Sequence, residues 1–405
     1  MRCGLLGKTL SYSYSPQIHA RLADYSYKLF ELHEDELDAF LTRGEFDGLN
    51  VTVPYKKAVI PYCAALTETA RAVGSVNTLI RRKDGTLLGD NTDCRGFRDL
   101  VLSGGISIAG KKALVLGSGG ASLAVRYVLA QLGAGEIIVI SRSGEDNYEN
   151  LDRHADAAIL VNTTPVGTYP NVEAAPLSLS HFPRLEAIFD LIYNPARTAL
   201  CLDAEARGIP AFSGLTMLVS QARGSAELWT GNAIPDEAVQ TICAALSAKM
   251  QNIVLIGMPG SGKSSIGRLL AQQLSRRFVD SDAKIVERTG MSIPEFFARH
   301  GEAAFRALEH EVLTELGKES GLVIATGGGC VTREENYAAL HRNSRIIRLR
   351  RDTALLPREG RPLSAGDLDA MYAVRAPLYA RFADFEIENS GSIEDAAAAI
   401  RKVLL

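Results

Sequence analysis

Short hydrophobic runs alternate with amphipathic stretches along the whole chain, a pattern typical of an α/β protein. Three of these runs are followed by glycine and then by a helical pattern: residues 113–116, 253–256 and 323–325. Each one predicts a buried strand whose glycine turn leads into a helix. We therefore expect an α/β fold from end to end.

The same pattern divides the chain. A helical pattern over residues 236–249 is followed directly by the strand pattern at 253–256, which predicts the main domain boundary near 248–251. A weaker boundary is expected near 100–110, where a helical pattern gives way to a glycine- and serine-rich turn. At roughly 150 residues per domain, the 405 residues predict two or three domains.

Composition narrows the class of protein. Hydrophobic residues make up 46% of the chain and charged residues 22%, which is typical of globular domains. The net charge of −3 argues against a chain-wide binder of nucleic acid or anionic membrane. We expect no membrane span and no signal peptide, because the apolar runs are too short. Six widely spaced cysteines without a CxxC pair predict reduced thiols in the cytoplasm.

The stretch from Gly257 to Ser264 matches G-x-x-x-x-G-K-[ST] without a gap. Its glycines, Gly257, Gly260 and Gly262, let backbone N–H groups surround phosphates. Lys263 supplies a positive charge, and the Ser264 hydroxyl suits Mg²⁺. A strand before and a helix after favour this interpretation over an ordinary glycine-rich turn.

Four later clusters narrow the substrate. Asp280 and Asp282 follow a short strand pattern, so we expect their carboxylates to point the same way, one toward Mg²⁺ and one toward a substrate hydroxyl. Arg306 and Glu309 lie three apart on one predicted helix face. Two further sets are a run of bare backbone, Gly327, Gly328 and Gly329, and the arginines of a proline-punctuated stretch, Arg358, Arg361 and Arg375. The arginines suggest anion clamps on a mobile lid.

The half of the chain from about 251 to 405 resembles shikimate kinase. The phosphate loop, D-S-D, F-R-x-x-E, the triple glycine, R-P-L and R-x-P-L-Y appear in the order of that family. A gluconate-type sugar-acid kinase is the alternative, since it shares the phosphate loop.

This resemblance implies roles for the matching residues. Lys263 and Ser264 serve ATP and Mg²⁺, and Asp280 lies near the metal. Asp282 contacts the substrate hydroxyls and is the candidate base. The substrate carboxylate is bound by Arg306 and Arg375 beside Gly327–Gly329, and Arg361 reaches the transferred phosphate.

A second glycine loop lies in the first half of the chain, between strand patterns at 113–116 and 136–140. Its residues are Gly117, Ser118, Gly119, Gly120, Ala121 and Ser122. The strand–helix–strand context predicts a dinucleotide-binding unit with the pyrophosphate at the helix N-terminus, although Ser122 occupies the third glycine position.

The residues after the second of these strands bear on the cofactor. NAD-binding units place an acidic residue there, whereas this chain has Ser141, Arg142 and Ser143. An arginine flanked by hydroxyls suits a ribose 2′-phosphate and predicts NADP. Glu145 and Asp146 are near enough to leave NAD open.

The first hundred residues contain polar blocks in a fixed order: S-Y-S-P from Ser13, N-V-T-V-P-Y-K ending at Lys56, V-N-T with Asn77, and N-T-D ending at Asp93. We expect Ser13 and Ser15 to present two hydroxyls from one side of an extended segment. Any one of these residues alone would be unremarkable, since a lone lysine is usually solvated.

Residues 1 to about 247 resemble shikimate dehydrogenase, because these blocks, the glycine loop, N-T-T-P-V-G at 162–167 and G-L-T-M-L-V-S-Q at 214–221 follow that family's order. The resemblance implies substrate binding by Ser13, Ser15, Thr52, Asn77, Asp93 and Gln221. It makes Lys56 and Asp93 the catalytic pair.

Together the two resemblances imply an α/β substrate domain at 1–100, with returning helices at about 218–247, a Rossmann NADP domain at 101–217 and a P-loop kinase domain with a parallel sheet at 251–405. They predict NADPH-dependent reduction of 3-dehydroshikimate and ATP- and Mg²⁺-dependent phosphorylation of shikimate. The expected partners are small-molecule substrates, neither nucleic acid nor membrane, with a homo-oligomer open. The alternatives are a quinate/shikimate dehydrogenase joined to another small-acid kinase, and a non-catalytic metabolite sensor.

Overall fold

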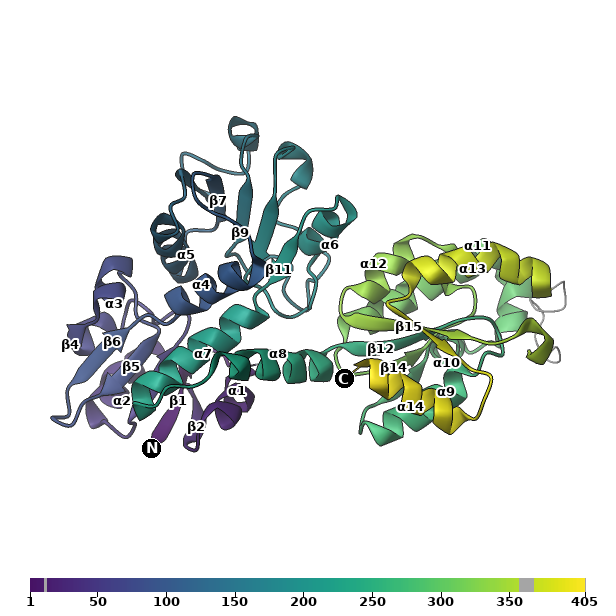
Figure 1. The fold of residues 1–405 in the computed structure, drawn as a ribbon, viewed down its shortest axis with the longest axis horizontal. Coiled ribbons are helices and arrows are strands. Elements are labelled where there is room, and N and C mark those ends of the chain that lie inside the picture. The colour runs from purple at the N-terminus through teal and green to yellow at the C-terminus, as the bar shows by residue number, and fades with distance from the viewer. Residues whose placement is uncertain (11–12, 357–367, 405) are drawn as a thin grey trace. The chain divides into compact units, whose positions relative to one another are not determined.

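The computed structural model describes residues 1–10, 13–356 and 368–404. The chain forms two compact units, one of Met1–Tyr193 with Thr198–Ala245, the other of Asn194–Arg197 with Leu246–Leu405 (Figure 1). The expected α/β fold class is confirmed in both. Within the described residues, every helix is too short or too polar to cross a membrane.

The first unit begins with a six-stranded mixed sheet in the order β2-β1-β3-β5-β6-β4. Its strands are β1 (Arg2–Gly7), β2 (Ser26–Glu31), β3 (Gly48–Val51), β4 (Cys63–Leu66), β5 (Thr78–Arg81) and β6 (Leu87–Asp90). β5 runs antiparallel to both β3 and β6, with Asn50 opposite Thr78 and Thr78 opposite Asp90. This register brings the end of β3, the start of β5 and the end of β6 to one edge of the sheet.

A second sheet in the same unit is parallel throughout, in the order β11-β10-β9-β7-β8. Its strands are β7 (Lys112–Leu116), β8 (Glu136–Ile140), β9 (Ile159–Asn162), β10 (Ala187–Asp190) and β11 (Ala211–Ser213). Parallel sheets are covered on both faces, which explains why β7 and β9 are almost continuously apolar. The helices of these two layers are α1 (Ser15–Leu22), α2 (Leu37–Arg43), α3 (Glu68–Val73), α4 (Asp93–Gly104), α5 (Gly120–Gln131) and α6 (Ala199–Ala206).

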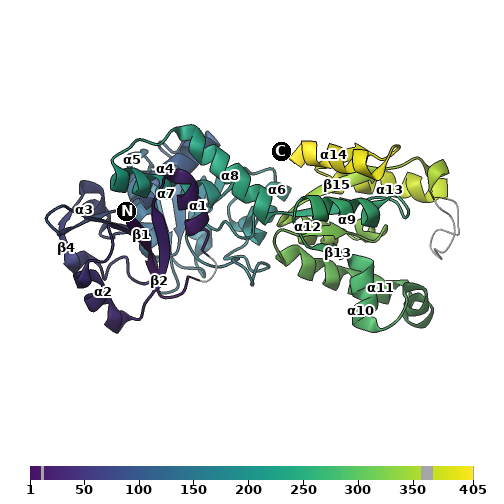
Figure 2. The ribbon, with the colours of Figure 1, turned by 90° about the horizontal axis from the view of Figure 1, so that it is seen from below.

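After the second sheet the chain returns to the first through α7 (Leu215–Thr230), which packs beside α4 and α1 (Figures 1 and 2). The indole Nε1 of Trp229 donates to the Leu79 carbonyl at 3.1 Å. The ring lies so close to Gly48 that any side chain there would collide with it. This anchor places the polar residues of α7 at the functional edge of the first sheet.

The second unit is built on a five-stranded parallel sheet in the order β13-β14-β12-β15-β16. The strands are β12 (Asn252–Ile256), β13 (Phe278–Asp280), β14 (Val323–Ala325), β15 (Ser344–Arg350) and β16 (Phe385–Glu388). α8 (Asp236–Met250) begins in the first unit and ends in the second. The other helices of the second unit are α9 (Lys263–Gln273), α10 (Ser281–Thr289), α11 (Ile293–Lys318), α12 (Glu335–His341), α13 (Leu368–Phe382) and α14 (Ile393–Leu404). Single turns of 3-10 helix occur at Glu34–Glu36, Ile60–Tyr62, Leu151–His154, Leu179–His181, Cys330–Thr332 and Thr353–Leu355.

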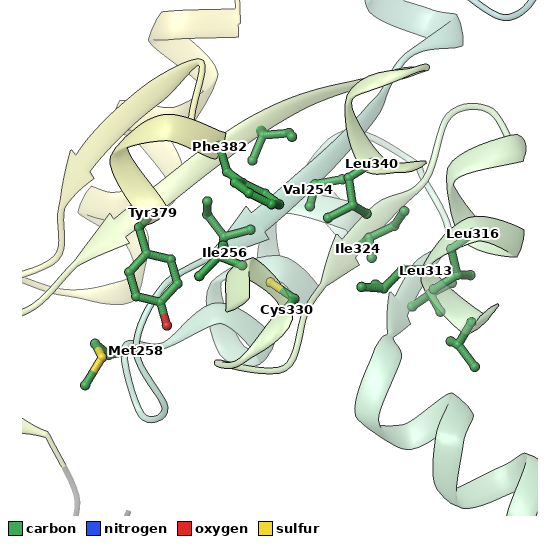
Figure 3. Close-up of a cluster of buried hydrophobic side chains, with 14 of the residues drawn as sticks. Val254, Ile256, Met258, Leu313, Leu316, Ile324, Cys330, Leu340, Tyr379 and Phe382 are labelled. Atoms are coloured by element: carbon green, nitrogen blue, oxygen red, sulfur yellow. The ribbon is translucent and has the colours of Figure 1, made fainter. Parts of the chain in front are cut away.

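Helices cover both faces of this sheet. α11, α12 and α13 lie on one face, α9 and α14 on the other (Figure 1). The core of the first face extends from Leu313 and Leu316 to Tyr379 and Met258 (Figure 3). Met258 belongs to the glycine turn after β12, so the turn is anchored in the hydrophobic core.

Candidate active sites

The polar blocks of the first unit converge on a cavity of about 480 Å³. All seven predicted substrate and catalytic residues line it: Ser13, Ser15, Thr52, Lys56, Asn77, Asp93 and Gln221. They come from the loop before α1, the turn after β3, the start of β5, the start of α4 and the middle of α7. The sheet register explains the meeting, because Val51 N–H donates to the Asn77 carbonyl at 2.7 Å.

Lys56 and Asp93 form the central ion pair of this cavity. Lys56 Nζ donates to Asp93 Oδ2 at 2.6 Å, and the side chains are 16% and 9% exposed. Asn77 Nδ2 donates to the other carboxylate oxygen of Asp93 at 2.8 Å. Both oxygens of Asp93 are therefore held, and the lysine is fixed beside the cavity.

A buried hydrogen-bond network of hydroxyl side chains connects to this pair through Asn77. Thr78 Oγ1 lies 2.8 Å from Ser225 Oγ and 3.1 Å from Thr92 Oγ1. The Thr92 N–H donates to Asn77 Oδ1 at 2.7 Å, and Asn50 Nδ2 donates to Ser225 Oγ at 2.7 Å. Buried polar networks of this kind restrict side-chain orientation when each member is satisfied.

Asn50 and Tyr193 are among the cavity residues that were not predicted as site residues from the sequence. Asn50 stands two residues before Thr52, so the alternation of side chains along a strand could have indicated it. Tyr193 follows β10 and packs edge-to-face on Tyr14, with ring centroids 6.1 Å apart. Nothing in the local sequence of Tyr193 signals that position.

The prediction of an extended segment carrying Ser13 and Ser15 was wrong. α1 begins at Ser15, and Tyr14 already has helical dihedral angles. The Ser13 hydroxyl accepts from the Ser15 N–H at 3.2 Å, a local turn that competes with an extended chain. Both hydroxyl-bearing residues still line the cavity.

The glycine loop after β7 borders the same cavity through Ala121. Gly117 has a φ of +99°, which favours glycine. Apart from Gly119 and its two chain neighbours, no atom of the described residues lies within 4 Å of the position that a Cβ would take on Gly119, so the backbone there is open to a ligand. On Gly120 the nearest atom to such a Cβ is Lys56 Cδ at 3.4 Å, which puts the loop beside the lysine.

At the end of β8, Arg142 is exposed, and no ion pair engages its guanidinium in the part of the chain that is described. Asp146, which left NAD open, is bound to His154 with Oδ1 2.8 Å from Nε2. The Asp146 backbone carbonyl also accepts from the Ser141 N–H. These contacts favour Arg142 over Asp146 as the group available to a ribose substituent.

In the second unit, the turn after β12 lines a cavity of about 570 Å³. Gly257, Gly260 and Gly262 all have positive φ values, so the turn needs glycine at these positions. Lys263 Nζ is buried and donates to the carbonyls of Gly257 and Met258, each at 2.9 Å. Ser264 Oγ donates to Asp280 Oδ2 at 2.6 Å, which joins the two predicted metal-binding groups in one oxygen-rich set suited to Mg²⁺.

Asp280 and Asp282 do not alternate along a strand as predicted. β13 ends at Asp280, whose Oδ1 caps α10 by accepting from the N–H groups of Asp282 and Ala283 at 3.0 and 3.3 Å. The capping preference of aspartate starts the helix earlier than the alternation suggests. Both side chains nevertheless line the cavity.

The triple glycine fits between side chains that surround it. A Cβ on Gly327 would lie 2.6 Å from Asp282 Oδ1 and 2.8 Å from Glu309 Oε1, and one on Gly328 would lie 2.7 Å from Pro259 Cδ. On Gly329 it would collide with the Arg306 guanidinium. Because these three residues have no side chain, Asp282 and Glu309 can lie close to the backbone at Gly327, and Arg306 can lie close to it at Gly329.

Arg306 and Glu309 share one helix face of α11, as predicted, and are joined by a 2.7 Å ion pair. Arg375 donates to the Gly328 carbonyl at 3.1 Å. Arg358 and Arg361 lie outside the described residues.

Asp282 is the most perturbed carboxyl of this cavity. Burial, and then the negative charges of Asp280 and Glu309, raise the pKa of Asp282 to about 6, although Lys263 and Arg306 oppose the shift. Its Oδ1 is buried and has no hydrogen-bond partner among the described residues. Burial also raises the pKa of Glu309. A carboxyl with this pKa can accept a proton near neutral pH.

Comparison with known proteins assigns the two units. The shikimate kinase family model matches residues 259–404, and the model of the shikimate dehydrogenase substrate binding domain matches residues 5–79. The shikimate dehydrogenase (NADP(+)) of Caldicellulosiruptor bescii is 36% identical over 253 residues, which cover 56% of this chain and 88% of that protein. The chain belongs to the shikimate dehydrogenase family. Its C-terminal part carries a shikimate kinase domain.

Solved structures agree with this assignment. Shikimate dehydrogenase 1 from Peptoclostridium difficile is 35% identical, with a TM-score of 0.57 over 61% of this chain and 98% of that one. A chorismate mutase/shikimate 5-dehydrogenase fusion protein from Clostridium acetobutylicum is 33% identical, with a TM-score of 0.58 over 61% of this chain and 97% of that one. This member of the shikimate dehydrogenase family is thus a bifunctional enzyme of the shikimate pathway. Its NADP(+) dehydrogenase relatives support the use of NADP, and its kinase domain supports the use of ATP.

Replacing Asp282 by Asn should stabilise the second unit above pH 6. Because the folded-state pKa lies above the ordinary 3.8, the folded chain binds more protons than the unfolded chain between pH 3.8 and about 6, and its free energy of unfolding falls as the pH rises through that window. The Asn variant lacks this penalty, so we expect a gain of about 1–3 kcal/mol at pH 7.5, equivalent to ~2–4 °C per kcal/mol in Tm. Calorimetry at pH 7.5 and pH 4 checks this, with the unit's transition identified by its shift on adding ATP. An equal gain at both pH values would contradict the assigned cause.

Proposed function

We propose that the first unit reduces 3-dehydroshikimate to shikimate with NADPH, and that the second phosphorylates the 3-hydroxyl of shikimate with ATP. The observation that carries the proposal is the pairing of each glycine loop with a reactive side chain. Gly120 lies against Lys56 in the first unit, and Lys263 shares its cavity with Asp282 in the second. We further propose a substrate part at 1–100 with helices at 218–247, a nucleotide part at 101–217 and a kinase part at 251–405.

In the first unit, Lys56 is the proposed proton donor. When bound, NADPH supplies the hydride that reduces the ketone carbon. The oxygen left by that addition gains negative charge and needs a proton, which the Lys56 ammonium can give. Asp93 holds Lys56 at 2.6 Å and is itself held by Asn77, so the donor is oriented before the substrate arrives. Ser13, Ser15, Thr52 and Gln221 would bind the carboxylate and hydroxyl groups of the substrate.

We propose that Arg142, assisted by Ser141, binds the 2′-phosphate of NADP. The Gly117–Ala121 loop would hold the pyrophosphate, because its backbone is open to a ligand at Gly119 and α5 begins at Gly120. His154 engages Asp146, one of the two acidic residues near the end of β8, whereas Arg142 is exposed there. Quinate remains a substrate to be compared with shikimate.

In the second unit, Asp282 is the proposed base that accepts the proton of the attacking hydroxyl. Its raised pKa lets the carboxylate accept a proton near neutral pH. Its Oδ1, which has no partner among the described residues, can accept a hydrogen bond from the substrate hydroxyl. Arg306 and Arg375 would bind the substrate carboxylate beside Gly327–Gly329. Lys263 would exchange its carbonyl partners for the phosphates of ATP, and Arg361 would reach the transferred phosphate, as in the family it resembles. Positioning and positive charge supply most of the rate in such transfers.

Ser264 and Asp280 fit a magnesium ion that also contacts ATP phosphates. Magnesium in such sites is commonly held by one or two protein oxygens and by the nucleotide. When bound, it would neutralise the charge of the phosphates, while Ser264 and Asp280 fix its position.

The purified full-length chain tests both reactions in one vessel. We expect 3-dehydroshikimate to drive NADPH oxidation, and subsequent addition of ATP and Mg²⁺ to release ADP and form shikimate 3-phosphate. Absorbance of NADPH and mass detection of the product measure the two steps. NADPH oxidation without ADP release would refute the kinase assignment alone.

Replacing Lys56 by Met should lower the kcat of the dehydrogenase about 10²–10⁴-fold, because the proton donor is lost while the substrate-binding hydroxyls remain. The KM for 3-dehydroshikimate should change much less. Steady-state kinetics check this, and the kinase rate of the same protein is the internal control. A kcat near that of the wild type would show that another group donates the proton.

Replacing Arg142 by Gln should raise the KM for NADPH roughly 10–100-fold, the loss expected for one charged hydrogen bond to phosphate. The KM for NADH should hardly change, since NADH lacks the 2′-phosphate. Arg43→Gln, which removes the same charge at the exposed end of α2, is the control. Equal effects on NADPH and NADH would mean that Arg142 does not contact the phosphate.

A further inference from the structure

We propose that Arg351 binds the phosphate chain of ATP in the second unit, a contact beyond the residues assigned above. Arg351 directly follows β15 and lines the 570 Å³ cavity together with Lys263, Ser264 and Asp280. This inference rests on the kinase reaction proposed above and adds a nucleotide-binding residue to it.

The sheet order places Arg351 on the nucleotide side of the cavity. β12, which leads into the phosphate loop, lies between β14 and β15. Gly327–Gly329 and Arg306, the proposed carboxylate-binding residue, flank the β14 side, whereas Arg351 follows β15 on the opposite side. A Cβ on Gly257 would lie 2.6 Å from the Leu349 carbonyl, so the chain entering Arg351 runs directly against the phosphate loop.

No described residue neutralises the guanidinium of Arg351. Its Nε atom is buried and has no hydrogen-bond partner, and the described part of the chain provides no ion pair for it. The other two cavity arginines are engaged, Arg306 with Glu309 and Arg375 with the Gly328 carbonyl. A half-buried cation without a partner is costly unless a ligand supplies one.

Phosphate oxygens are the ligand atoms that best match the guanidinium at this position. A guanidinium presents paired N–H donors that match phosphate geometry, and such charged hydrogen bonds are about twice as strong as neutral ones. The neighbouring Arg350 shows the contrast, because it is exposed and lies 3.7 and 3.8 Å from Glu386 and Glu388. Side chains of adjacent strand residues point to opposite faces, so only Arg351 is directed to the cavity.

The test compares Arg351→Gln with Arg350→Gln, which removes the same charge one residue away. Both are made in the full-length chain. For Arg351→Gln we expect the KM for ATP, and the Kd of a non-hydrolysable ATP analogue measured by calorimetry, to rise about 10-fold or more. The KM for shikimate and the inhibition constant of adenosine, which has no phosphate, should stay within about twofold. Arg350→Gln should leave all four constants near the wild-type values.

Three results would overturn the proposal: ATP constants within twofold of the wild type, a rise confined to the KM for shikimate, or an equal weakening of adenosine and ATP. Arg351→Met, which keeps the packing of the side-chain stem, is the second variant, and thermal unfolding verifies that the unit is folded in each. If the wild-type chain fails to phosphorylate shikimate, the proposed function fails, but binding of the ATP analogue still decides the role of Arg351.

Discussion

Two strands that are buried on both faces, β7 and β12, fix the positions of the two glycine turns on which the candidate sites depend. Each must turn sharply at its carboxyl end because a helix has to return across the sheet, and each turns through glycines with positive φ, at Gly117 and Gly257. The turn leaves backbone N–H groups pointing outward at the start of α5 or α9, which is the arrangement that binds phosphate groups. In the second unit, Asp280 and Gly327–Gly329 lie near the turn because neighbouring parallel strands end at the same edge. In the first unit, Lys56 and Asp93 come from the mixed sheet, and the glycine loop meets them at Gly120.

The two units solve the problem of a buried charge differently. In the first, Lys56 and Asp93 neutralise each other, and Asn77 with the hydroxyls of Thr78, Thr92 and Ser225 fixes their orientation. In the second, Asp282 faces other carboxylates and carries a raised pKa. Under the proposed function, the first arrangement would keep a proton donor in place, and the second would keep a carboxyl ready to receive a proton.

Much of this architecture could be predicted from the sequence, because strands that are buried on both faces and glycine turns are local signals. The strands at Glu136–Ile140 and Val323–Ala325 have the predicted bounds. The errors arose where a polar side chain competes with the backbone pattern, as in the cap at Asp280 and the early start of α1 at Ser15. Asn50 was missed although alternation indicates it, whereas Tyr193 and Arg351 reach their cavities only through tertiary packing.

The triple glycine, Gly327–Gly329, limits which substitutions this segment can accept. Every missense change of a glycine codon introduces a Cβ, and at Gly327, Gly328 and Gly329 that atom meets Asp282 and Glu309, Pro259 or Arg306. A substitution at these positions therefore requires the facing side chains to move, which the ends of Asp282, Glu309 and Arg306 can do and the Pro259 ring facing Gly328 cannot. Gly328 is therefore the position of the three at which a substitution would be tolerated least.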